Sequence, residues 1–110
     1  MAGACLGERE RPGPPRITFS IDDPSVTTSR TDTVAGDIRA EDRDGIDSVW
    51  VALDSVQLGE DGGFDQVFSS RYRFFVAPGR GIGEQVPLRL RARDISGFQV
   101  QRDTYVVVVP

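Results

Sequence analysis

The segment 86–94 constrains the fold of this chain more than any other part of the sequence. Apolar and polar residues alternate there in the order Val-Pro-Leu-Arg-Leu-Arg-Ala-Arg before Asp94. A period of two is typical of a β-strand with one buried face and one solvated face. The turn residues of 94–97 and the apolar run that ends at Val109 predict a returning strand. We therefore expect an antiparallel β-hairpin at this end of the chain.

Shorter alternating segments fill the sequence from residue 16 onward. No window shows a helical period bounded by capping residues, so we expect essentially no helix. We expect strands at 17–21, 34–40, 49–53, 56–58, 64–68, 72–77, 86–94 and 105–109, and either a loop or a short edge strand at 25–32. Strands and turns that recur about every 8–12 residues are typical of a β-sandwich. The sequence therefore predicts an all-β fold, with a single domain over 16–110.

Residues 1–15 differ from the rest of the chain in composition. Their prolines, glycines and alternating charges leave little to bury, which predicts a disordered leader. The leader holds the only cysteine, Cys5, so an internal disulfide is excluded. Small residues before Cys5 and a polar Pro/Gly stretch after it resemble the end of a bacterial lipoprotein signal peptide, which implies a lipid on Cys5. The alternative is a frayed N-terminus with an inert thiol.

Charge and residue usage exclude several function classes. The formal net charge of −4 argues against a general nucleic-acid binder, because such proteins carry a basic surface. The chain has no histidine, which removes the commonest general base and the commonest zinc ligand. No serine or cysteine motif places a nucleophile beside a base, so we expect no enzymatic activity. No apolar segment is long enough to span a membrane, so we expect membrane contact only through a lipid on Cys5.

Two segments carry a resemblance to a known family. The pattern Gly-x-Ile-x-Ala-x-Asp at 36–42, followed by Gly-Ile-x-Ser-Val-x-Val at 45–51, resembles strands B and C of bacterial immunoglobulin-like domains. The segments 86–97 and 105–109 resemble strands F and G of the same domains, and the texture is similar to fibronectin III and cadherin-like modules. The resemblance implies an immunoglobulin-like Greek-key β-sandwich of about seven strands. It also implies an extracytoplasmic spacer or adhesion module, with a protein or a cell-surface glycan as partner.

An acidic stretch after the second predicted strand is a candidate calcium site. Four carboxylates lie close together in the sequence, at Glu41, Asp42, Asp44 and Asp47. Calcium is bound by six to eight oxygen atoms, and cadherin-like modules use acidic loops in this way. The alternative is a plain turn, because Asp and Gly are ordinary turn residues and Arg43 within the stretch opposes a cation.

Arginines and aromatic residues on the strands form a second candidate site. Arg89, Arg91 and Arg93 point away from the buried face of their strand, so they are placed to bind an anionic glycan or phosphate, or simply to form a solvated sheet face. Trp50 and Phe75 are out of phase with the apolar rows of their strands, which predicts exposed contacts for a sugar or a protein. For Trp50 the alternative is the buried strand-C tryptophan of immunoglobulin-like sandwiches.

These observations favour a non-enzymatic, extracytoplasmic structural or adhesion module, anchored by a lipid if Cys5 is modified. A calcium- or carbohydrate-binding module is the first alternative. A subunit of a larger extracellular assembly is the second, because a final strand can pair its edge with a neighbour. Calcium is the only cofactor that the sequence indicates.

Overall fold

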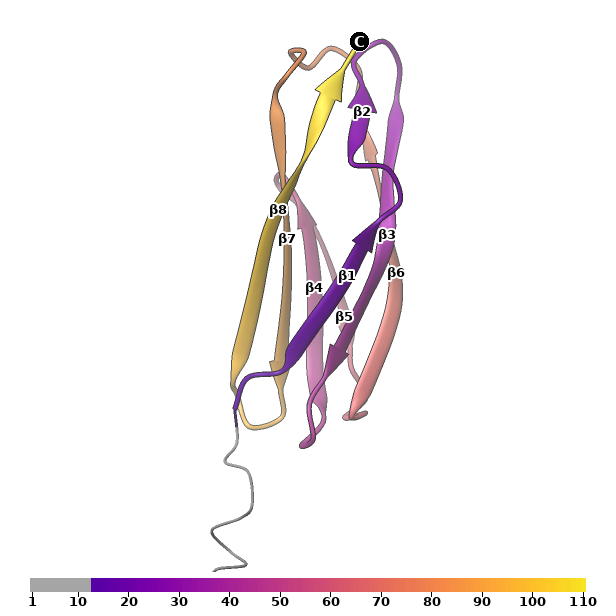
Figure 1. Cartoon of the computed structure of the whole chain (residues 1–110). Helices are drawn as coiled ribbons and strands as arrows, with labels where there is room; N and C mark the ends of the chain where they lie inside the picture. Colours follow the sequence, from indigo (N-terminus) through magenta and orange to yellow (C-terminus); the bar gives the residue numbers. More distant parts are fainter. Residues whose placement is uncertain (1–12) are drawn as a thin grey trace, which may run out of the picture.

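A computed structural model describes residues 13–110, which form two packed β-sheets (Figure 1). The described residues contain no helix, as predicted. The strands are β1 (Arg16–Ile21), β2 (Ser25–Thr27), β3 (Asp32–Glu41), β4 (Ile46–Leu53), β5 (Val56–Asp61), β6 (Val67–Val76), β7 (Gln85–Asp94) and β8 (Gln99–Val109). The prediction of an all-β sandwich is therefore confirmed.

The two sheets differ in width. One sheet has three strands in the order β1-β3-β6, and the other has five in the order β2-β8-β7-β4-β5. Every pairing is antiparallel except that of β2, which lies parallel to the end of β8. The hairpin expected at 86–109 is present, with Val86 opposite Val106 and Ala92 opposite Val100. The strand β7 therefore occupies the centre of the larger sheet.

The core lies between the sheets and consists of the inward rows of every strand except β5. Burying one such side chain contributes about 1.5–3 kcal/mol, which is enough for a domain of this size to fold without a disulfide. The buried apolar residues are Ile17, Val26, Val34, Ile38, Ala40, Ile46, Val49, Val51, Leu53, Tyr72, Phe74, Val76, Val86, Leu88, Leu90, Ala92, Val106 and Val108.

Several predicted strand boundaries are wrong, among them the start of the last strand, which is at Gln99 rather than at residue 105. The strands expected at 64–68 and 72–77 form the single strand β6, which pairs with β3 without a break at Ser69 and Ser70. Serine is tolerated there because β6 is an edge strand, and the Ser70 hydroxyl donates a hydrogen bond to Glu60 of β5. Phe64 belongs to the preceding turn, and β5 continues to Asp61 rather than ending at residue 58.

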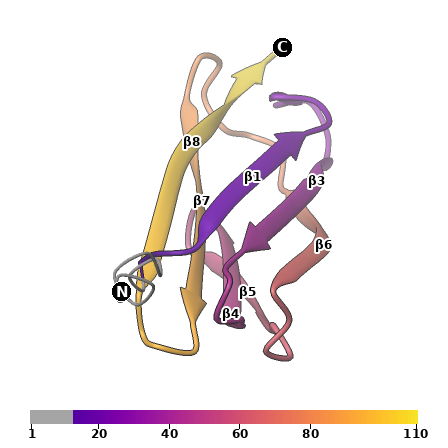
Figure 2. The ribbon, with the colours of Figure 1, turned by 60° about the horizontal axis from the view of Figure 1, so that its bottom comes forward.

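The sandwich has two ends, which determine where a site can lie. At one end the described chain begins at residue 13, and the turns 42–45, 62–66 and 95–98 lie together (Figures 1 and 2). We call this end the entry pole. The last strand runs away from it, so that Pro110 lies at the opposite end, the exit pole (Figure 1).

Candidate metal centre

Strands β3 and β7, one from each sheet, place aspartates at the entry pole. The apolar part of the inward row ends at Ala40 in β3 and at Ala92 in β7. Side chains alternate along a strand, so the residues two positions further, Asp42 and Asp94, follow the inward direction of their rows. Because β3 and β7 belong to facing sheets and both run toward the entry pole, their terminal aspartates converge.

Three carboxylates form a cluster at this point. One oxygen each of Asp42, Asp44 and Asp94 lies within 4.8 Å of the others. Asp94 is fully buried (0% exposed), Asp42 is partly buried and Asp44 is exposed. The cluster therefore opens to solvent on the side of Asp44 and is closed by protein on the side of Asp94.

Asp94 is the unusual member of the cluster. Its Oδ1 atom accepts hydrogen bonds from the backbone amides of Ser96 and Phe98, at 2.9 Å each, and so closes the 95–98 turn. Its Oδ2 atom is buried and has no hydrogen-bond partner. Buried carboxylate oxygens are nearly always paired, because an unpaired one loses its hydration without compensation. The Oδ2 atom is thus placed to share a proton with a neighbouring carboxyl or to bind a cation.

Backbone hydrogen bonds fix the position of the other two aspartates. Asp42 accepts the amide of Asp44 on Oδ1 at 2.8 Å and the amide of Gly45 on its carbonyl at 3.1 Å. Gly45 has a φ of 106°, and a Cβ there would lie 2.6 Å from the carbonyl oxygen of Phe64. Its own carbonyl accepts the amide of Ile95 at 3.1 Å. The three turns of the entry pole therefore meet at Gly45.

The electrostatics of the cluster are unfavourable without a counter-charge. The pKa of Asp42 is raised above its ordinary value of 3.8, first because the group is partly desolvated and further because the carboxyl of Asp94 lies beside it. Two facing carboxylates repel each other when both are charged, and a proton or a cation between them removes this repulsion. The arrangement is therefore suited to hold either one.

Only two of the four predicted calcium ligands belong to the carboxylate cluster. Asp42 and Asp44 belong to the cluster, whereas Glu41 points outward and forms an ion pair with Arg39 at 2.9 Å. Asp47 lies at a shift in the β4–β7 register, where its backbone carbonyl accepts the amide of Gly62. The described residues thus contribute two of the four predicted ligands and add Asp94.

Sequence reasoning missed Asp94, although a signal for it exists. The turns after 36–40 and after 86–92 share the form Ala-x-Asp, and in both the alanine is a buried, inward residue. Once the two strands are assigned to facing sheets, the repeated Ala-x-Asp predicts that both aspartates meet. The run 41–47 by itself contains no sign of this meeting.

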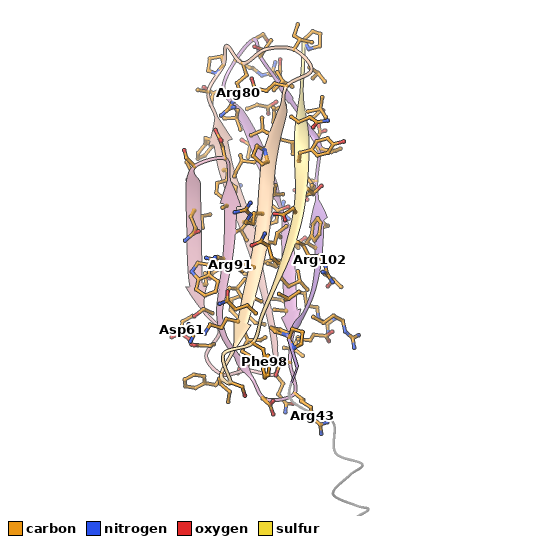
Figure 3. The ribbon with its side chains drawn as sticks, turned by 90° about the vertical axis from the view of Figure 1, so that its left-hand side faces the viewer. Arg43, Asp61, Arg80, Arg91, Phe98 and Arg102 are labelled. Atoms are coloured by element: carbon orange, nitrogen blue, oxygen red, sulfur yellow. The ribbon has the colours of Figure 1, made fainter. Side chains whose placement is uncertain are left out.

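The second candidate site is only partly assembled. The guanidinium of Arg91 lies 4.6 Å from the ring centroid of Trp50 on the outer face of the five-stranded sheet (Arg91 is labelled in Figure 3). Arg89 and Arg93 share this face, and Arg89 pairs with Asp103 at 2.9 Å. Phe75, the remaining predicted contact, lies on β6 of the other sheet and is not part of this face.

Trp50 fits neither of the two alternatives drawn from the sequence. It is partly buried rather than exposed or enclosed, and Gly59 of the neighbouring strand leaves room for its indole edge. Because Arg91 covers a face of the ring, the stack forms part of the sheet surface rather than an open sugar platform. Cys5 lies outside the described residues.

An open hollow of about 420 Å³ lies beside the carboxylate cluster. It is lined by the entering chain and by the turns, at Gly13, Pro14, Arg16, Glu41, Asp42, Arg43, Asp44, Gln66 and Val67. Figure 3 shows Arg43 and Phe98 at this end of the molecule. The described residues include no helix of the length and apolarity needed to cross a membrane.

Comparisons with known proteins return no relative. No family model, no curated protein and no solved structure matches this chain.

Proposed function

We propose that this chain is a non-enzymatic, extracytoplasmic structural module of immunoglobulin-like type whose entry pole binds calcium. The observation that carries the proposal is the buried Oδ2 atom of Asp94, which has no partner and faces the carboxylates of Asp42 and Asp44. A divalent cation supplies the missing partner and removes the repulsion between the three groups.

The chemistry of the cluster favours calcium over other metals. Its ligands are carboxylate oxygens, which suit calcium, magnesium and manganese rather than the softer transition metals. Calcium accepts irregular coordination and both monodentate and bidentate carboxylates, whereas magnesium demands a near-ideal octahedron. Three carboxylates leave positions open for water, an arrangement suited to the weak, millimolar sites of extracellular modules.

The strand order supports the immunoglobulin-like part of the proposal. When the strands β1, β3, β4, β6, β7 and β8 are read as A, B, C, E, F and G, strands B and E share one sheet and C, F and G share the other, as in that family. The chain enters at one pole and leaves at the other, which suits a module that spaces or presents its neighbours.

Thermal unfolding tests the calcium site. In about 10 mM calcium, tenfold a millimolar Kd, the melting temperature should rise relative to EDTA, because a ligand at tenfold its Kd stabilises the folded state by about 1.4 kcal/mol. For a domain of this size that corresponds to about 6 °C. Magnesium should give a smaller shift. An unchanged melting temperature in calcium contradicts the proposal.

The variant Asp94→Asn separates binding from folding. Asparagine keeps an Oδ1 acceptor for the amides of Ser96 and Phe98, so the turn is retained while the ligand charge is lost. We expect the calcium shift to disappear and the stability in EDTA to increase, because the repulsion with Asp42 is removed. The matched control, Asp47→Asn, changes a carboxylate of the same pole outside the cluster and should keep the calcium shift.

The anchoring part of the proposal concerns Cys5. A lipid there would tether the chain from the side of the entry pole, where the described residues begin. Labelled palmitate should enter the natural gene product and be absent from its Cys5→Ser variant. Equal labelling of both would contradict lipidation at this residue.

A further inference from the structure

One side of the sandwich is open because the two sheets differ in width. Across the core, β1 packs on β7 and β8, while β3 and β6 pack on β4. The strand β5 has no described strand over its inner face, and all six of its residues are exposed. Ser70 of β6 donates a hydrogen bond to Glu60 of β5, so the margins of the two sheets lie close together on this side.

Two apolar side chains of β5 point into this opening. In the β4–β5 register, Leu58 is opposite Val51 and Val56 is opposite Leu53. Residues directly opposite in an antiparallel pair share a face of the sheet, and Val51 and Leu53 are buried in the core. Val56 and Leu58 therefore face inward, yet they are 56% and 42% exposed. The core has an apolar strip here that no described strand covers.

The edge of β6 beside this strip is free and regular. The strand pairs with β3 through all of its residues without a bulge, and no described strand pairs with its other side (Figures 1 and 2). Alternate residues of a strand direct their N–H and C=O groups to opposite edges, so half of these groups on β6 are not used by β3. The strand contains no proline or glycine, and its only charges, Arg71 and Arg73, point outward.

The other sheet edges carry features that discourage the addition of a strand. Natural proteins protect edges by keeping them short and by placing charges on the inward row. The inward row of β5 contains Glu60, opposite Val49, and that of β8 contains Arg102, opposite Leu90. The strands β1 and β2 are only six and three residues long. Among the described strands, β6 is therefore the edge best suited to pair with a further strand.

We propose that the edge of β6 binds an extended segment of a partner protein as an added strand. Neighbouring strands lie about 4.8 Å apart, so a strand beyond β6 lies over β5, as β6 lies over β4. Its backbone bonds to β6, and its alternate apolar side chains cover Val56 and Leu58. In this mode of recognition the main chain supplies affinity and the side chains supply specificity.

Charge complementarity defines the outward side chains of the partner segment. Arg71 already forms ion pairs with Asp22 and with Asp37. Arg73 lies opposite Ala35, is exposed, and has no carboxylate partner among the described residues. An acidic side chain on the added strand, next to Arg73, supplies that partner. The segment therefore alternates apolar with polar residues and carries an acidic residue at this point.

The same two arginines argue against a second copy of this chain as the occupant. Two copies of β6 related by a twofold axis pair antiparallel, with residues of the same face opposite one another. A pairing centred on residue 71 or 73 places an arginine opposite itself, and one centred on residue 72 places Arg71 opposite Arg73. Like charges directly opposite destabilise a sheet. An acidic partner segment meets no such repulsion.

Fluorescence anisotropy with the full chain tests the inference. The probe is a labelled peptide as long as β6, in which valine alternates with threonine and glutamate takes the two central polar positions. EDTA is present throughout, so failure here is separate from failure of the calcium site. We expect saturable binding, about tenfold tighter than that of the same peptide with lysine in place of both glutamates. No binding, or equal binding of the two peptides, would overturn the proposal.

The sign of this preference is informative because the chain as a whole is acidic, with a formal net charge of −4. Non-specific attraction would favour the lysine peptide, whereas pairing beside Arg73 favours the glutamate peptide. Tighter binding of the lysine peptide would therefore also overturn the proposal.

Backbone methylation distinguishes strand addition from adhesion through side chains. Two versions of the glutamate peptide carry N-methyl groups on alternate amides, one version for each alternating set. Only one set faces β6 in an added strand, so methylation of that set should abolish binding and methylation of the other should retain it. The same effect of both versions would show that the peptide does not pair as a strand.

Two pairs of variants locate the site. Leu58→Ser should weaken binding by about fivefold, because an inward valine of the peptide loses an apolar contact. Ile82→Ser is its control, since Ile82 is 66% exposed in the loop 77–84. Arg73→Glu should reverse the preference for the glutamate peptide, whereas Arg93→Glu makes the same charge change on the outer face of the other sheet and should keep it. Equal effects within either pair would overturn the assignment to β6.

The free protein shows whether the edge is already occupied. We expect a monomer by light scattering, with rapid hydrogen exchange at the β6 amides that face away from β3. Dimers that Leu58→Ser abolishes would show a second copy on the edge. Protection of these amides in the monomer would show that another part of this chain covers them. Either result would overturn the assignment to a partner protein.

Discussion

Tyr72 connects two strands that are not neighbours in the three-stranded sheet. Its side chain crosses β3 at Gly36, and its hydroxyl donates a hydrogen bond to the carbonyl of Ser20 in β1 at 2.6 Å. A Cβ at Gly36 would lie 1.9 Å from that carbonyl oxygen and 2.5 Å from the hydroxyl. The sheet therefore needs a residue without a side chain at this position.

The substitution Gly36→Ala should destabilise the protein by about 3 kcal/mol, the upper range for overpacking, because the new methyl group collides with backbone on β1. Denaturant unfolding measures this. Gly81→Ala is the control, because a Cβ there meets no atom within 4 Å, and it should change stability by less than about 0.5 kcal/mol. Similar losses in the two variants would contradict the steric explanation.

The same tyrosine should make the protein sensitive to alkali. Burial, and then the nearby charges of Asp22 and Asp37, raise the pKa of Tyr72 to about 12 from a usual value of 10. The folded state thus holds the phenol proton more tightly, so the stabilisation is complete below pH 10 and is lost as the pH rises toward about 12. Two pKa units correspond to about 3 kcal/mol. Unfolding free energies at successive alkaline pH values should show a loss in the wild type that Tyr72→Phe lacks.

At the residue scale, the sequence predicts which carboxylates are close in the chain but not which ones meet in space. Asp42 and Asp44 were recognised as ligand candidates because they are two residues apart. Asp94 joins them only through the packing of two sheets, which no local pattern contains. Glu41 lies outside the cluster because strand parity directs it outward, a consequence that the alternation of 34–40 already implies.

At the scale of the element, the outer face of the larger sheet carries a stacked pair of side chains, Trp50 and Arg91. Trp50 of β4 and Arg91 of β7 are directly paired in the register, with Gly59 of β5 on the other side of the indole. The Nε atom of Arg91 is buried and has no hydrogen-bond partner. The guanidinium is therefore stabilised by the ring and not by a carboxylate.

We expect Arg91→Gln to lower the free energy of unfolding by about 0.5–1 kcal/mol, the usual value of a partly exposed cation–π contact. Trp50 is the only tryptophan in the chain, so its emission reports the stack directly and should shift to longer wavelength. Arg93→Gln, one step along the same outward row, should leave the emission unchanged. A shift of equal size in the control would show a general effect of charge.

Strand positions follow from the sequence where the apolar alternation is strict, as in β3, β4 and β7. The alternation is weaker at the edges of the sheets. All six residues of β5 are exposed, so no apolar period marks its end, and the exposed half of β6 contains the two serines that mimic a turn. The apolar alternation that predicts a strand arises because one face of the strand is buried. Edge strands bury few residues, so they show this alternation weakly.

At the scale of the whole molecule, the two poles are built differently. The exit pole is closed by ion pairs of Arg80 with Asp54 at 2.9 Å and with Glu84 at 2.6 Å, so its charges are already matched. The entry pole instead holds carboxylates that face one another. A cation should therefore act on one end of the sandwich only.

Hydrogen exchange with and without calcium checks this asymmetry. The amides of 42–45 and 95–98 should exchange more slowly in calcium, because the cation links the two turns, and the closing of one turn restricts the other through the Ile95–Gly45 hydrogen bond. The exit-pole loop 77–84 lies at the far end of the core and should exchange at the same rate in both conditions. Protection spread evenly over both poles would indicate a general salt effect, and protection at the exit pole alone would place the cation outside the Asp42–Asp44–Asp94 cluster.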